Sequence, residues 1–179
     1  MLQSSEWFSR NGIECSRVIA RDDEFPRHSH DEYVVSANLS GIEEIWLSGK
    51  TLTVNSGQVT LYNPCTIQSS GFAQQSVEFI SIHLPQSVIK TLVGQENLGS
   101  HSHAPLFREG VLNDQRLFNA ICRFADSALG DNPNQQQQEL LLLCAELLDT
   151  PVPLSGVEQQ QISRVTDYLR DHLAEKPQL

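Results

Sequence analysis

The period of the hydrophobic pattern changes once along this chain, near residue 110. Before that point, short segments alternate apolar and polar residues and are separated by turn sequences rich in Gly, Asn, Ser and Pro. The segments expected to be strands are residues 14–21, 32–39, 43–47, 51–54, 58–62 and 77–84. Many short strands at this spacing are typical of a β-sandwich or barrel. The fold class predicted from the pattern is therefore mainly β with α.

Helical spacing takes over after residue 110. A first helix, near residues 114–129, has one apolar face made of Leu117, Ile121, Phe124 and Ala128. A second helix, near residues 134–149, follows Asn132 and Pro133, which suit the N-cap and the first helical position. Its leucine run is too apolar for a helix with a single buried face. We expect it to pack against the first helix and against a second surface.

The last part of the chain begins with a Pro-containing linker, residues 150–156, where a helix cannot continue. Ser155 and Glu158 have the spacing of a capping box, so a third helix is expected after the linker. Its apolar stripe is Ile162, Val165, Leu169 and Leu173. This stripe is followed by no further element to pack against, which is typical of a domain that is cut off.

Charge and composition exclude two classes of protein. The net charge of −10 weighs against DNA binding by this chain alone, because cationic residues are needed to displace phosphate counterions. No apolar run approaches the ~18 residues of a membrane span, and the first residues do not resemble a signal peptide. The chain is expected to be cytoplasmic, with free thiols, since its cysteines form no CxxC pair.

Two motifs stand out in the strand-rich half. His28 and His30 form an H-x-H directly before a predicted strand that ends near Gly41, and the segment GQVTLYNP follows at residues 57–64. Their order and spacing resemble the small cupin barrel at the N-terminus of AraC-family transcription regulators, and the resemblance covers essentially all of the chain. It implies a cupin-like jelly-roll barrel in residues 1–110, a helical dimerisation module in residues 111–150, and a linker with the first helix of a helix-turn-helix DNA-binding domain in residues 151–179.

This resemblance implies a regulatory domain and not an enzyme. The domain would sense a small-molecule effector, form a homodimer and control DNA binding allosterically, with DNA contacted only through a C-terminal domain missing from this chain. Leu141 and Leu148 are the residues expected to contribute to the dimer. Catalytic residues, cofactors and a membrane partner are not expected.

Metal binding is not expected either. Metal-binding cupins add a Glu four or five residues after the H-x-H and a His in the second motif, but here Val34, Val35 and Gln68 occupy these positions. A metal site usually needs three or four ligands with an ordered outer shell. His83 is available as a third ligand, whereas Glu32 lies close in sequence at a different spacing. A second H-x-H, His101 and His103, lies in a Gly/Ser-rich loop and is expected on the surface.

Without a metal, the effector would be held by hydrogen bonds and apolar walls. Alternate residues of a strand share a face, which puts Phe79, Ser81 and His83 on one side of the last strand. We expect this mixed face to line the pocket and the aliphatic face to meet the helices. The residues expected to line the effector pocket are His28, His30, Trp46, Gln68, Ser81 and His83.

Four alternatives stay open at this stage. The H-x-H can be two polar residues on a solvated surface, and Trp46 can be an ordinary core residue. The chain can be a free-standing cupin enzyme, such as an isomerase or a dioxygenase, although the missing metal ligands argue against this. It can also be an assembly domain whose barrel binds no ligand.

Overall fold

The computed structural model describes residues 2–10, 12–95 and 105–150. Its strands are β1 (Leu2–Arg10), β2 (Ile13–Ala20), β3 (Asp23–His28), β4 (Tyr33–Ser40), β5 (Glu43–Leu47), β6 (Lys50–Val54), β7 (Val59–Tyr62), β8 (Gln68–Phe72), β9 (Val77–Leu84) and β10 (Gly110–Leu112). Its helices are α1 (Gln86–Gln95), α2 (Gln115–Ala128) and α3 (Pro133–Asp149). None of these helices is long and apolar enough to cross a membrane.

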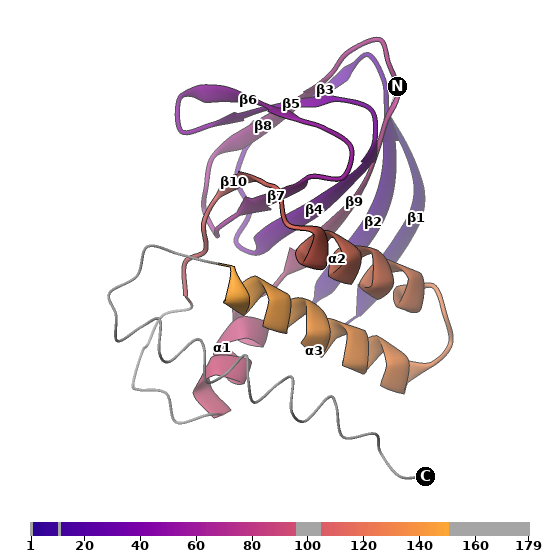
Figure 1. Cartoon of the computed structure of the whole chain (residues 1–179), viewed down its shortest axis with the longest axis vertical. Coiled ribbons are helices and arrows are strands. Elements are labelled where there is room, and N and C mark those ends of the chain that lie inside the picture. The colour runs from indigo at the N-terminus through magenta and orange to yellow at the C-terminus, as the bar shows by residue number, and fades with distance from the viewer. Residues whose placement is uncertain (1, 11, 96–104, 151–179) are drawn as a thin grey trace.

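The strands of the described residues form two antiparallel sheets that face each other, with α2 and α3 beneath the larger one (Figure 1). The larger sheet has six strands in the order β1-β2-β9-β4-β7-β10, and the smaller has four in the order β3-β8-β5-β6. Strands far apart in sequence, such as β2 and β9, are neighbours in this arrangement. The prediction of a mainly β fold of the jelly-roll type, followed by helices, is confirmed.

All the predicted strands are present, as β2, β4, β5, β6, β7 and β9, and the two predicted helices are α2 and α3. The sequence analysis missed β1, β3, β8, β10 and α1. Pro26 obscured β3, but a proline is tolerated there because β3 is an edge strand. The sequence of β8, QSSGF, has almost no apolar residues because much of it faces the polar space between the sheets.

The outer face of the larger sheet is covered by helices. Aliphatic residues of β4 and β9 pack there in one buried cluster with apolar residues of both long helices, among them Val35, Ile80, Ile82, Leu84, Leu117, Ile121, Leu143 and Leu147. This confirms that the aliphatic face of β9 meets the helices. The cluster also explains the leucine-rich sequence of α3, which packs against α2 and reaches the core beneath the sheet.

The two long helices begin as the sequence predicts and are joined by ion pairs. The side chain of Asn132 caps α3 by accepting from the backbone N–H groups of the first turn, and Asp114 caps α2 in the same way. Arg116 of α2 lies 3.0 Å from the carboxylate of Glu146 on α3. These exposed pairs contribute little free energy, so burial of the apolar cluster is what holds the helices to the sheet.

The position of Leu148 corrects one expectation. Leu148 was expected at a dimer interface, but only 1% of it is exposed and it belongs to the buried cluster of its own subunit. The register of α3 turns this residue inward, whereas Leu141 is only partly buried. The expected linker and third helix, residues 151–179, and the histidines His101 and His103 lie outside the described residues.

Gly41 connects β4 to β5 at a point where the chain passes very close to β9. Its φ is +82°, and a Cβ placed on it would lie 2.4 Å from the carbonyl oxygen of Ser76. Gly49, in the β5–β6 turn, has the same φ of +82° but no atom within 4 Å of such a Cβ. The two glycines therefore separate the effect of a positive φ from the effect of close packing.

We predict that Gly41→Ala destabilises the fold clearly more than Gly49→Ala. The second change should cost about 1–2 kcal/mol, the usual penalty for a left-handed backbone at a residue with a side chain. The first adds a clash with backbone that cannot move without disturbing the larger sheet. Urea denaturation of both variants measures the difference in the free energy of unfolding, and equal losses would contradict the packing argument.

Candidate functional site

A cavity of about 330 Å³ lies between the two sheets. Its walls come from β2, β4, β7 and β9 of the larger sheet and from β3, β5 and β8 of the smaller one. Apolar clusters that include Phe72 and Val77 on one side, and Ile45 and Val54 on the other, fill neighbouring parts of the space between the sheets. The volume is in the range of small-molecule sites.

Strand alternation explains why polar side chains form part of the wall of this cavity. On β9, Ser81 and His83 line the cavity, while the aliphatic residues between them face the helices. On β4, Ser36 faces the same way, and its hydroxyl lies 3.3 Å from that of Ser81. The face of the larger sheet that is turned away from the helices thus presents hydroxyl groups and a histidine to whatever enters the cavity.

Glu43 and Tyr62 place two strongly polar groups in the cavity wall. Only 6% of Glu43 is exposed, and this burial raises the pKa of its carboxyl group, although a hydrogen bond from Ser70 opposes the shift. The hydroxyl of Tyr62 lies beside Thr60 but meets no partner in hydrogen-bond geometry among the described residues. Buried polar groups without partners are rare, so this hydroxyl is available to a ligand.

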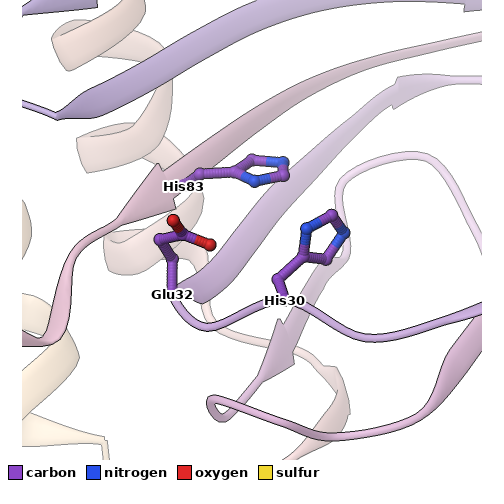
Figure 2. A group of neighbouring side chains, drawn as sticks. All are labelled: His30, Glu32 and His83. Carbon is purple, nitrogen blue, oxygen red and sulfur yellow. The ribbon is translucent and has the colours of Figure 1, made fainter.

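Three histidines gather at a half-buried edge of the cavity. His28 ends β3, His30 lies in the loop before β4, and His83 comes from β9. The ring of His30 lies edge-on to the other two, with centroid separations of 4.8 Å to His28 and 4.6 Å to His83. The carboxylate of Glu32 completes the group: Figure 2 shows His30, Glu32 and His83 pointing toward one another.

The surroundings of His30 and His83 favour the neutral form of both imidazoles. Burial is the main cause that lowers the pKa of both His30 and His83, and the neighbouring histidines lower that of His30 further. The negative charges of Glu14 and Glu32 oppose these shifts only in part. Nδ1 of His28 lies 2.6 Å from the carbonyl oxygen of Pro26, so an N–H there donates to that carbonyl and leaves Nε2 as an acceptor.

Five of the six residues expected to line the pocket do line this cavity: His28, His30, Gln68, Ser81 and His83. His28 and His30 were expected to point the same way because alternate residues of one strand share a face. In the structure, β3 ends at His28 and His30 lies in the following loop, so strand alternation is not the reason that both line the cavity. Gln68 lies opposite His28 in the pairing of β3 with β8. Whether these residues bind an effector is a separate question, taken up below.

Trp46 does not line the cavity. On β5 the inward positions are Glu43, Ile45 and Leu47, which are buried, so Trp46 takes the other face. There its ring lies under the guanidinium of Arg27, 3.9 Å from the ring centroid. The sequence analysis missed Glu43 because charged residues are almost never fully buried. The alternation of side chains along β5, which puts Glu43 on the same face as Ile45 and Leu47, was the one signal that pointed to Glu43.

We predict that Glu43→Gln gains stability relative to the wild type as the pH rises. Burial raises the folded-state pKa of Glu43 above its ordinary value of 4.5, so the folded wild type loses stability as the pH increases through that raised pKa. The difference in unfolding free energy should be smallest at or below pH 4.5 and grow toward neutral pH. Chemical denaturation at several pH values measures it, with Glu44→Gln on the exposed face of β5 as the control. A difference that does not change with pH would contradict the prediction.

Three similar solved structures each match less than half of this chain. A conserved protein of unknown function from Streptococcus pyogenes is 19% identical with a TM-score of 0.44, over 48% of this chain and 75% of its own. A cupin superfamily protein from Desulfitobacterium hafniense is 12% identical with a TM-score of 0.45, over 48% and 78%. The EutQ protein of Clostridium difficile is 13% identical with a TM-score of 0.41, over 47% and 68%. Comparison with curated proteins gives no match.

A family model gives a much longer match. The model of the AraC-like ligand-binding domain matches residues 10–148. This span begins at the end of β1 and runs through both sheets, the cavity, the histidine group and both long helices. The match agrees with the resemblance found in the sequence. The chain belongs to the family of AraC-like ligand-binding domains.

Proposed function

We propose that the cavity between the sheets binds a small-molecule effector, and that this binding controls an attached DNA-binding domain. The single observation that carries the proposal is the buried, unpartnered hydroxyl of Tyr62 beside the buried carboxyl of Glu43, in a cavity of about 330 Å³. A fold that keeps such groups in its interior loses stability unless something pairs with them. Membership in a ligand-binding family supports the same conclusion.

The cavity favours a small polar or amphipathic effector. Tyr62 can donate a hydrogen bond to the ligand, and Ser36, Gln68 and Ser81 offer further donors and acceptors. Val18, Phe25 and Phe79 provide an apolar wall on which the rest of the molecule can pack. The carboxyl group of Glu43, whose pKa is raised by burial, is a further polar group in the cavity wall.

We propose that three consecutive segments of the chain have different functions. Residues 1–110 bind the effector, residues 111–150 form the dimerisation module, and residues 151–179 lead to the DNA-binding domain. The larger sheet is the common wall of the cavity and the helical cluster. An effector that fits one arrangement of this wall better than another would shift how the helices are held, which is the requirement for allosteric control.

We predict that an effector found by thermal-shift screening of small polar metabolites binds more weakly to Tyr62→Phe. Loss of one hydrogen bond should cost about 0.5–1.5 kcal/mol of binding free energy. Trp46→Phe, an aromatic change on the other face of β5, is the matched control and should bind as the wild type does. Calorimetric titration measures both. Undiminished binding by Tyr62→Phe would place the ligand elsewhere, and turnover of the molecule would favour a cupin enzyme.

We also predict that the chain forms a homodimer through the partly buried face of α3 around Leu141. Burial of a leucine contributes roughly 1.5–3 kcal/mol, so Leu141→Glu should weaken the dimer strongly, and it should destabilise the subunit far less than Leu148→Glu because Leu141 is only partly buried. Leu148→Glu should unfold the subunit instead, because Leu148 is in the core. Analytical ultracentrifugation and circular dichroism distinguish these results. A wild type that stays monomeric at high micromolar concentration would contradict the proposal.

A further inference from the structure

The histidine group at the cavity edge has a composition that effector binding does not explain. His30, Glu32 and His83 each offer one ligand atom, and these atoms all lie within 4.8 Å of one another. Their side chains converge on a common point in Figure 2. We propose that His30, Glu32 and His83 form a binding site for a divalent transition-metal ion at the edge of the cavity.

The chemistry of the three ligands suits such an ion. Two imidazole nitrogens and one carboxylate oxygen are a recurrent set for zinc and for non-haem iron, and three protein ligands leave a coordination position open. Metal–ligand distances near 2.0–2.2 Å require ligand atoms closer together than 4.8 Å, so the side chains must rotate slightly inward on binding. All three residues are only half-buried, and His30 and His83 also line the cavity, which leaves the side chains room for this rotation.

The sheet register brings these residues together. Val34 of β4 lies directly opposite His83 of β9, and Glu32, two residues before Val34, is on the same side of the chain. The loop between β3 and β4 then places His30 against the ring of His83. His30 and Glu32 precede β4, and His83 is in β9. The two segments are distant in sequence, and the backbone pairing of β4 with β9 brings them together.

The surroundings of the three ligands support metal binding. Glu14 lies opposite His83 in the pairing of β2 with β9 and adds negative charge next to the site. His28, which is oriented by the carbonyl of Pro26, lies next to His30 and is the nearest candidate for a fourth ligand.

This ligand set differs from the one that the sequence analysis found to be missing. Val34, Val35 and Gln68 occupy the positions where metal-binding cupins carry a Glu and a His, and the expectation of no metal rested on those positions. Glu32 and His83 supply the same two kinds of ligand from other places in the fold. The sequence spacing alone did not reveal this, because the two residues meet only across the β4–β9 pair.

The test is a calorimetric titration of the chelator-treated 179-residue chain with Zn²⁺ alone. One ion per chain should bind, and His83→Ala and Glu32→Gln should each weaken binding by more than the roughly 10–100-fold that loss of an outer-shell partner costs. Asp31→Asn, a carboxyl group next to Glu32 that is not in the cluster, is the matched control and should bind as the wild type does. Circular dichroism checks that each variant is folded.

A second measurement needs no variant in the cluster. X-ray absorption of the zinc-loaded wild type should show imidazole and oxygen ligands without sulfur, and Cys65→Ser should bind zinc normally. Sulfur in the coordination shell, or loss of binding in Cys65→Ser, would place the ion at the exposed Cys65 and overturn the proposal. The absence of stoichiometric binding by the wild type, or binding unchanged in both His83→Ala and Glu32→Gln, would overturn it as well.

Discussion

The larger sheet must be covered on both faces, and the rest of the structure depends on how this is done. Its outer face is aliphatic and is buried by α2 and α3, and its inner face is mixed and turns toward the smaller sheet. Burial of apolar area supplies the stability on the outer side, at about 25 cal/mol per Å². On the inner side, only part of the space is filled by apolar clusters, and a cavity lined with polar groups remains between them.

The cavity has two chemically distinct regions. Glu43 and Tyr62 are buried deeply, and in the described part of the chain the Tyr62 hydroxyl lies beside Thr60 without a partner in hydrogen-bond geometry. The three histidines are half-buried and line the edge of the cavity, and the half-buried Glu32 lies next to His30 and His83. If both proposals hold, an ion at the edge would sit next to the bound effector, and its open coordination position would be available to a donor group of that molecule. Effector affinity would then depend on the metal, although each site is tested separately.

The shared sheet also gives a physical route from ligand to helices. Ser81 and His83 face the cavity while Ile80 and Ile82, on the same strand, pack in the cluster that contains the helices. Tightly packed clusters do not deform continuously, so a small shift of β9 has to be accommodated by a new arrangement of the helices. The proposed regulation would therefore act through the contact between the larger sheet and α2 and α3, and not through the smaller sheet.

The sequence by itself determined the strands with clear alternation, both long helices, the N-cap of the second helix, and the face of β9 that carries Ser81 and His83. These features depend on local periodicity and capping chemistry, which a single chain segment contains. Only the tertiary structure decided that Glu43 and Tyr62 meet in one cavity, that Glu32 reaches His83, that Trp46 faces away and that Leu148 is in the core. Each of these depends on the register between strands or on the rotation of a helix against the sheet. A shift of one residue in the pairing of a strand moves all of its side chains to the opposite face of the sheet. The sequence of one strand does not show which residues of the neighbouring strand it will pair with.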